Sequence, residues 1–212
     1  MNAQQAIAEA TLLAELQSGD ESAFAGLVDD LNDGLLAFAR TFTSSPALAE
    51  DIVQETWLGV IRGLRDFEGR ASIKTWVFSI LARRARTMAV RDARSSATES
   101  SRASSETEWQ PGNGRRGLWE RTPVPWALAD PAAIYESREA LEVLQTTLDS
   151  LPATQRQVVL LRDVEGLPAP DVCNMLGLTE TNQRVVLHRG RARLRRALDQ
   201  YVQGGVTPPL PT

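Results

Sequence analysis

The sequence has very little of the residues on which most catalytic and metal sites depend. Its 212 residues include one cysteine, Cys173, and one histidine, His188. A single cysteine excludes an internal disulfide framework and a zinc site of the usual multi-cysteine kind. A glycine-rich phosphate loop and a nucleophile motif are also missing. An enzyme is therefore the least favoured class, and we expect no cofactor and no metal site.

Long apolar runs are missing as well. No stretch of about eighteen successive apolar residues occurs, so the sequence predicts no transmembrane helix. The opening segment MNAQQAIAEATLLAEL lacks the cationic start and the continuous apolar core of a signal peptide. We therefore expect a cytoplasmic protein that does not insert into a membrane.

Basic residues are scarce in the N-terminal part of the sequence, and acidic residues are scarce in two later segments. Residues 1–60 hold ten acidic residues and one basic residue, Arg40, for a net charge of −9. Residues 74–94 have a net charge of +5 and residues 181–198 have one of +6, and nearly all of these cations are arginine. One such cluster could equally be a solvated helix face. Two arginine-rich clusters favour contacts with a polyanion, because arginine matches phosphates and guanine edges.

Alternation of apolar and polar residues is absent, and apolar residues recur at helical spacing instead. This spacing occurs in residues 7–16, 24–42, 48–64, 76–90, 134–148, 158–161 and 185–198. Residues 95–130 are rich in serine, glycine and proline and are too long for a loop inside one compact domain. We therefore predict an all-α fold with two small helical domains, residues 1–94 and 131–203, joined by a flexible linker and followed by a disordered tail at 204–212.

The predicted linker is not purely polar, because Trp109, Trp119 and Trp126 lie within it. Two interpretations stay open. The tryptophans are incidental residues of a solvated linker, or the segment GLWERTPVPW docks on a domain or on a partner.

Residues 168–198 have the pattern of a helix-turn-helix. Gly177 is placed to end a short helix with a left-handed cap, and Thr179 is placed to begin the next helix. Cys173 lies beside the apolar positions of the first helix, as a small buried residue would. The side chains expected to hold the second helix against the core are Val185, Val186, Leu194 and Leu198. An ordinary helical hairpin is the alternative interpretation.

The second helix of this motif would enter the major groove of DNA with its N-terminal turns. Arg184 and Arg189 could bind guanine, Asn182 could bind adenine, and later arginines could contact phosphates. The residues predicted to contact DNA here are Thr181, Asn182, Arg184, Val185, His188, Arg189, Arg191 and Arg193.

Longer segments resemble one family. LPATQRQVVLLRDVEGL from Leu151, followed by ETNQRVVLHRGRARLR, resembles region 4 of bacterial RNA polymerase sigma factors. AEDIVQETWL from Ala49 resembles region 2.2 of the extracytoplasmic-function group, and Phe67 followed by KTWVFSI from Lys74 resembles region 2.3/2.4. The resemblance covers residues 20–94 and 134–200 with no region 3 between them. The chain is thus similar to a two-domain sigma factor of the sigma-70 family.

The resemblance implies two partners in core RNA polymerase. Region 2.2 of the family docks on the coiled coil of the β′ subunit, and the β flap is the other implied contact. Ile52 and Val53 are better interpreted as core residues of the same helix. The residues that match the polymerase-binding positions, or lie beside them, are Glu50, Asp51, Gln54, Glu55, Trp57 and Leu58.

The segment RDFEGRAS, residues 65–72, matches the loop with which the family captures a flipped base of the −10 promoter element. Trp76 would help to open the duplex or would only pack in the core. Family members often carry asparagine seven residues after this tryptophan, whereas Arg83 stands here, which leaves the choice of −10 base open. The implied −10 contacts are Phe67, Glu68, Gly69, Arg70, Lys74, Trp76, Arg83, Arg84, Arg86 and Arg91.

The function implied by the resemblance is that of an alternative sigma factor, active in stress responses. It would bind core RNA polymerase and direct transcription initiation by reading the −10 and −35 elements of promoter DNA. The family also implies an anti-sigma factor as a partner. Two alternatives stay open: a conventional helix-turn-helix regulator that acts without polymerase, and an interaction module that does not read DNA.

Overall fold

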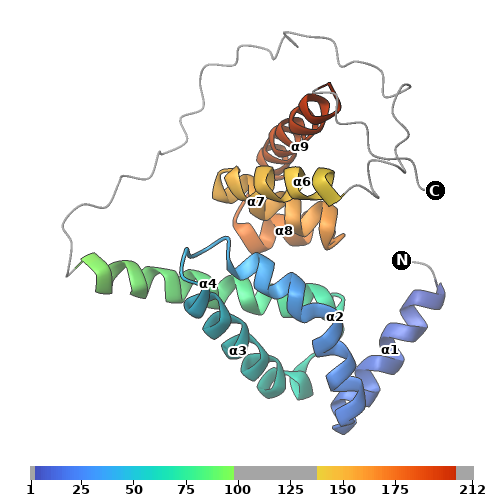
Figure 1. Cartoon of the computed structure of the whole chain (residues 1–212). Helices are drawn as coiled ribbons and strands as arrows, with labels where there is room; N and C mark the ends of the chain where they lie inside the picture. The colour runs from blue at the N-terminus through green and yellow to red at the C-terminus, as the bar shows by residue number, and fades with distance from the viewer. Residues whose placement is uncertain (1–2, 98–137, 204–212) are drawn as a thin grey trace.

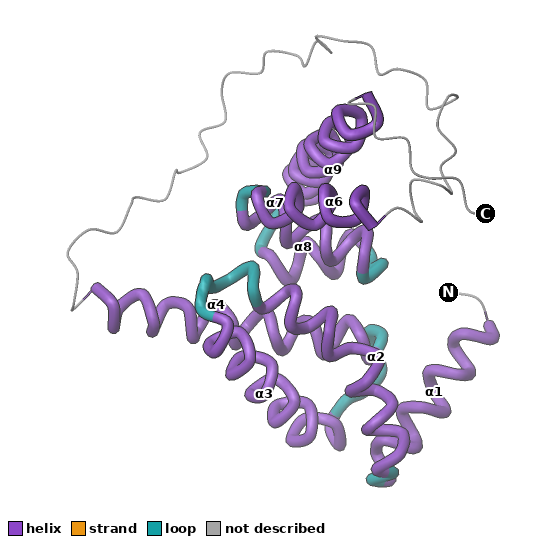
Figure 2. The backbone as a smooth tube through the Cα atoms, viewed as in Figure 1, coloured by secondary structure: helices purple, strands orange, loops and turns teal. Residues whose placement is uncertain are grey.

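The computed structural model describes residues 3–97 and 138–203, and every regular element in these ranges is helical (Figures 1 and 2). The predicted all-α fold is confirmed. None of the described helices is long and apolar enough to cross a membrane. The elements are α1 (Ala3–Ser18), α2 (Glu21–Ala39), α3 (Pro46–Gly63), the 3-10 helix η1 (Leu64–Asp66), α4 (Ile73–Ala97), α6 (Arg138–Ser150), α7 (Ala153–Val159), the π-helical turn η3 (Leu160–Val164), α8 (Ala169–Leu176) and α9 (Glu180–Gln203).

Several predictions fall on other parts of the chain. Most of the predicted linker, with its three tryptophans, and the predicted tail lie outside the described residues. Helix α4 continues to Ala97, past the domain end predicted at residue 94. The side chains of residues 91–97 are outside the description, and Arg91 is among them.

Helix ends in the N-terminal half follow from their capping residues. Asp20 Oδ1 accepts the backbone N–H groups of Ser22 and Ala23 at 2.8 and 2.9 Å, which starts α2. The preceding Gly19 has a φ of 84°, a conformation that glycine adopts without strain. Ser45 caps α3 in the same way as Asp20 caps α2, by accepting the N–H of Leu48.

The N-terminal core lies between α2, α3 and α4. Phe38 packs edge-on against Phe42, with ring centroids 5.2 Å apart, and lies 5.9 Å from Phe78. Ile52 and Val53 are buried, so their interpretation as core residues is confirmed. Apolar burial of this kind supplies most of the stability of such a helical bundle.

In the C-terminal half, α7 packs closely against α9 at Gly190. A Cβ on Gly190 would lie 2.6 Å from Cγ2 of Val159, which is closer than real Cβ atoms approach a neighbour. Val159 is β-branched and stiff at χ1, so it cannot swing away. Gly190 is therefore required by packing, although it lies inside a helix.

The two halves also pack directly against each other, with α8 lying on α4 (Figure 1). The side chains of Leu161, Leu167, Val172 and Met175 belong to the same apolar cluster as the N-terminal core. The sequence predicted two domains and a linker but did not predict this contact, because nothing local in an amphipathic helix tells which other helix covers it.

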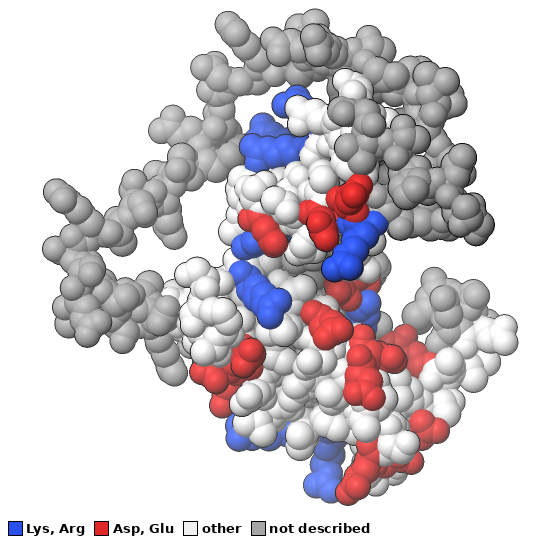
Figure 3. Space-filling view, viewed as in Figure 1, with Lys and Arg blue, Asp and Glu red and all other residues white. Residues whose placement is uncertain are grey.

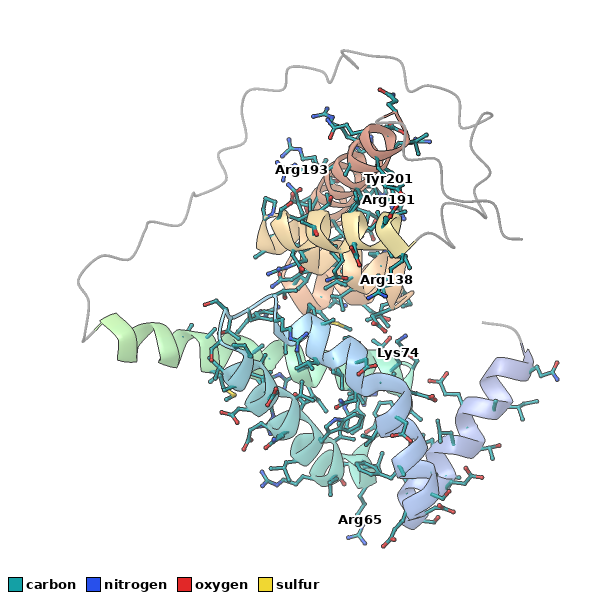
Figure 4. The ribbon with its side chains drawn as sticks, viewed as in Figure 1. Arg65, Lys74, Arg138, Arg191, Arg193 and Tyr201 are labelled. Carbon is teal, nitrogen blue, oxygen red and sulfur yellow. The ribbon has the colours of Figure 1, made fainter. Side chains whose placement is uncertain are left out.

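An ion pair closes the boundary between the halves. Lys74 Nζ lies 2.7 Å from Glu165 Oε2, and Figure 4 shows Lys74 at this boundary. The same carboxylate lies against α2 at Gly34, where a Cβ would overlap it. Gly34 thus permits the docking of η3 on α2. We call this contact the latch: Gly34, Lys74 and Glu165.

Replacing Gly190 by alanine tests the close packing of α7 on α9. Alanine favours a helix interior by about 1 kcal/mol over glycine, whereas overpacking costs about 1–3 kcal/mol. We expect Gly190→Ala to lower the free energy of unfolding by about 1 kcal/mol in urea titrations followed by circular dichroism.

Gly26 is the matched control, because it lies inside α2 and a Cβ added there would meet no neighbour within 4 Å. Gly26→Ala should raise the free energy of unfolding by about 0.5–1 kcal/mol. Stabilisation by both substitutions would contradict the packing role of Gly190.

Candidate nucleic-acid interface

The turn between α8 and α9 has the geometry of a helix-turn-helix. Gly177 has φ 67° and ψ 34°, and its N–H donates to the carbonyl of Cys173. Thr179 Oγ1 accepts the N–H of Asn182 at 3.2 Å. Both predicted caps are confirmed, and Leu178 packs between the helices of the C-terminal cluster.

Helix α9 turns one side to the core and the other to solvent. Gln183, Leu187 and Gly190 are buried, at intervals of three or four residues. The residues predicted to contact the −35 element are exposed, except for the half-buried Asn182. Five of them, Thr181, Arg184, Val185, His188 and Arg189, lie on one side of the first turns, as a major-groove reader requires.

One packing prediction in α9 is wrong. Val185 is 41% exposed and does not pack in the core, whereas Leu187 is 8% exposed and does. Val186 and Leu194 pack against the core as predicted. The buried side could have been found from the spacing Gln183, Leu187, Gly190, but a glutamine and a glycine are weak signals of burial.

Two arginines of α9 are held by neighbouring elements. Arg191 Nε and Nη2 donate to the Asp163 carboxylate at 2.8 and 2.5 Å, and these hydrogen bonds raise the pKa of Arg191. Arg193 Nη1 donates to Gln155 Oε1 at 3.0 Å. Figure 4 shows both arginines on α9. Arg184 makes only a loose, exposed pair with Glu180 at 3.4 Å, so it is easily released to a base or a phosphate.

A second surface lies at residues 65–72, which we call the capture loop. Phe67 stacks on Trp76 with ring centroids 4.5 Å apart and an interplanar angle of 24°. Beside this stack is a cavity of about 720 Å³, within the range of small-ligand sites. Its lining includes the basic residues Arg70, Arg83 and Arg86, together with Asp171, Asn174 and Met175 from α8.

The other predicted −10 residues divide between this cavity and ion pairs. Gly69 has a φ of 70°, and its neighbours Glu68 and Arg70 pair with each other at 2.5 Å. Lys74 is occupied by Glu165 in the latch. Arg84 lies across Gly59 and donates to Glu55 Oε2 at 2.6 Å, so a predicted DNA contact pairs with a predicted polymerase contact.

The residues predicted to bind polymerase lie along α3. Glu50, Asp51, Gln54 and Leu58 are exposed on one side of the helix. Trp57 is half-buried instead, packing on Phe24 with centroids 5.8 Å apart and donating to Asn32 Oδ1 at 3.3 Å.

The exposed side of α3 continues to Ile61, which is 56% exposed. Ile61 follows Leu58 by three residues, a spacing that could have indicated it. Figure 3 shows acidic side chains most numerous over the part of the face where α1 and α2 lie. The acidic character of residues 1–60 is thus expressed on the surface of the N-terminal half.

Cys173 is buried in α8, as predicted, and burial raises the pKa of its thiol. A buried thiol with a raised pKa reacts slowly, which does not favour a redox sensor. Among the residues that the structure describes, no three His, Cys, Asp or Glu side chains are grouped to hold a metal ion.

Comparison with known proteins decides what these surfaces belong to. The sequence matches the family Sigma-70 region 2 over residues 27–95 and the family Sigma-70, region 4 over residues 141–194. The chain belongs to the extracytoplasmic-function group of sigma-70 factors. It is an alternative sigma factor, which directs promoter-specific initiation of transcription, and a conventional regulator that acts without polymerase is not favoured.

Individual relatives agree with this assignment. The sigma factor is 28% identical over 172 residues to a probable RNA polymerase sigma factor of Haemophilus influenzae, covering 78% of this chain and 84% of the relative. It is 27% identical to the ECF RNA polymerase sigma factor SigX of Bacillus subtilis, covering 84% and 85% of the two chains. It is 30% identical to SigG of Mycobacterium tuberculosis over 88% of this chain and 53% of that one.

Solved structures share the fold. The sigma factor RpoE in complex with the anti-sigma factor NepR from Bartonella quintana superposes with a TM-score of 0.56 at 21% identity, covering 82% of this chain and 96% of that one. CnrH in complex with the cytosolic domain of CnrY gives a TM-score of 0.53 at 24% identity, covering 91% and 97%.

Variants of Trp76 test the packing of its ring in the folded protein. Trp76→Ala removes the stack on Phe67 and a half-buried ring, so we expect the free energy of unfolding to fall by about 2–3 kcal/mol. Trp76→Phe keeps an aromatic face and should cost less than about 1.5 kcal/mol. Urea unfolding followed by circular dichroism measures both.

Arg83→Ala is the control, because Arg83 is exposed on the same cavity. Its stability should stay within about 0.5 kcal/mol of the parent. Equal stability of the parent and Trp76→Ala would show that the ring does not pack in the folded state.

Proposed function

We propose that this sigma factor binds core RNA polymerase through the exposed side of α3 and reads promoters with two separate surfaces. The observation that carries the proposal is the combination, in one chain, of a cavity with an aromatic wall beside α4, large enough to admit a base, and an exposed, arginine-bearing α9. An acidic and apolar helix surface suits a basic partner helix, which supports the β′ coiled coil as the partner of α3. The β flap is proposed as a second polymerase contact.

The −10 element is read at the capture loop. A flipped base needs a pocket with a stacking face and polar groups at its edge. The Phe67–Trp76 stack and the polar groups of residues 68–70 supply both, while Arg83 and Arg86 are placed for phosphates. This step moves no covalent bond, so the factor requires no catalytic residue and no cofactor.

The −35 element is read by α9. Arg184 and Arg189 are exposed in its first turns, where the helix enters the major groove, and both can bind guanine bidentately. Arg191 and Arg193 are held by Asp163 and Gln155 and are better placed for phosphates than for bases. His188 and Val185 complete the side that faces the bases.

The remaining partners follow from this role. The factor acts in the cytoplasm, where core polymerase meets promoter DNA. The two solved relatives are described in complex with an anti-sigma factor and with the cytosolic domain of CnrY, respectively. This supports an inhibitory partner that holds the present chain away from polymerase until a stress signal releases it.

Run-off transcription with core polymerase and genomic templates tests the function. The parent should give promoter-specific transcripts, and Arg184→Ala/Arg189→Ala should weaken −35 use by about 1–3 kcal/mol per lost base contact. Arg138→Ala, an exposed arginine on α6, should leave promoter use unchanged. A parent that transcribes no promoter, or that shifts duplex DNA equally well without polymerase, would overturn the proposal.

We further infer that the halves separate during promoter reading. The two elements are centred about 25 base pairs apart, which is about 85 Å at about 3.4 Å per base pair. A compact chain of this length has a radius of gyration of about 17 Å. The closed arrangement therefore cannot place α4 and α9 on both elements at once. We propose that the latch opens when the holoenzyme binds a promoter.

A reversible cross-link tests this opening. The Cδ of Glu165 lies 2.9 Å from the position that a Cβ on Gly34 would occupy, so Gly34→Cys/Glu165→Cys brings two cysteines side by side and should form a disulfide. In a Cys173→Ala background, we expect the oxidised protein to lose run-off transcription and a reductant to restore it. Each single cysteine variant, treated identically, should stay active. Full activity of protein whose disulfide is verified by gel mobility would show that opening is not needed.

A further inference from the structure

Helix α1 contacts the capture loop through polar side chains, although α1 lies before the segment matched to Sigma-70 region 2. Gln17 Nε2 donates to the carbonyl of Leu64 at 3.0 Å and to the carbonyl of Phe67 at 3.1 Å. One amide group thus holds the residue that precedes the loop and the residue that supplies its aromatic ring.

A second residue of α1 holds the other end of the loop. Glu9 Oε1 accepts the backbone N–H of Ile73 at 2.8 Å. Ile73 is the first residue of α4, and an N–H in the first turn has no partner within its own helix. Ser72 Oγ accepts the N–H of Thr75, so α4 begins with one cap from the loop and one from α1.

A third contact reaches the middle of the loop. A Cβ on Gly69 would lie 3.6 Å from Cδ2 of Leu13, so the glycine backbone rests beside this leucine. Glu9, Leu13 and Gln17 are four residues apart and therefore lie on one side of α1. A single helix contacts both ends and the centre of the capture loop.

These contacts determine the walls of the cavity. Phe67 forms one wall, and its carbonyl is fixed by Gln17. Trp76 stacks on Phe67 in the same wall and lies in the first turns of α4, whose start is fixed by Glu9. A loop that contains a glycine has many conformations, and ordering it on binding reduces affinity. Holding it in place beforehand reduces that loss.

We propose that α1 is a positioning element for −10 base capture and that Glu9 and Gln17 are its positioning residues. The proposal rests on the proposed function of the capture loop. The apolar side chains of α1 also pack with the N-terminal core, through Leu12, Leu13 and Leu16. The two polar residues contact the loop, so changing them tests positioning while leaving the apolar packing in place.

The test uses holoenzyme and a labelled single-stranded oligonucleotide that spans the −10 element of a promoter transcribed by the parent. Gln17→Glu keeps the shape of the side chain but replaces the N–H donor by an oxygen that repels both carbonyls. We expect about fivefold to tenfold weaker binding of the matched oligonucleotide. The affinity ratio between matched and base-substituted oligonucleotides should fall, because a misplaced loop discriminates less.

This ratio separates positioning from stability. A variant that is only less stable lowers the active fraction equally for all oligonucleotides and leaves the ratio unchanged. Gln4→Glu is the matched control, since Gln4 is exposed on the same helix and undergoes the same chemical change. At the other end, Glu9→Ala should lower the ratio and Glu9→Gln, which keeps an oxygen acceptor, should restore it.

The outcomes distinguish the two proposals. If the parent transcribes no promoter, the proposed function fails. If the parent transcribes and discriminates while Gln17→Glu and Glu9→Ala keep the parent ratio, the positioning role of α1 is wrong and the proposed function stands. Loss of discrimination in Gln4→Glu as well would also overturn the specific role of Glu9 and Gln17.

Discussion

The carboxylate of Glu165 joins the two halves of the molecule. Its side chain is 11% exposed, it pairs with Lys74 at 2.7 Å, and it rests on the bare backbone of α2 at Gly34. A carboxylate that loses its water needs a compensating charge, and Lys74 provides it. When the halves separate, the ammonium and the carboxylate both regain water, so such an ion pair contributes little net free energy to holding the halves together. The latch therefore fixes where the halves meet, while the main cost of separating them is the exposure of the apolar side chains of Leu161, Leu167, Val172 and Met175.

Several of the basic residues predicted to bind DNA are paired with carboxylates of the same chain. Lys74 pairs with Glu165, Arg84 with Glu55, and Arg191 with Asp163. Each of these cations must leave or share its carboxylate before it contacts a phosphate, which subtracts from the affinity for any DNA. Phosphate contacts supply most non-specific binding. The pairs thus limit non-specific binding of the closed factor, whose net charge is −4, while Arg184 and Arg189 stay exposed.

What the sequence could predict was local. Gly177 and Thr179 indicated the ends of α8 and α9, because a left-handed cap and a hydroxyl cap depend on a few adjacent residues. Val185 was predicted both to pack on the core and to contact DNA, and the packing role is wrong, because successive residues of a helix are about 100° apart and a pair of valines cannot settle which one is buried. The contacts of Glu165, Glu9 and Gln17 join elements distant in sequence, and exposed polar residues carry no pattern that reveals such partners.

The cavity is supported by α1 and lined in part by α8, and these two elements behave differently when the halves separate. The contacts of α1 with the capture loop lie entirely within the N-terminal half, so Phe67 and Trp76 keep their supports in either state. Asp171, by contrast, reaches the cavity from α8 and leaves with the C-terminal half. Its departure removes an acidic group from a cavity that retains Arg70, Arg83 and Arg86. Under the proposed opening, the cavity would become wider and more basic while its aromatic wall stayed in place, and such a cavity suits a negatively charged strand with a flipped base.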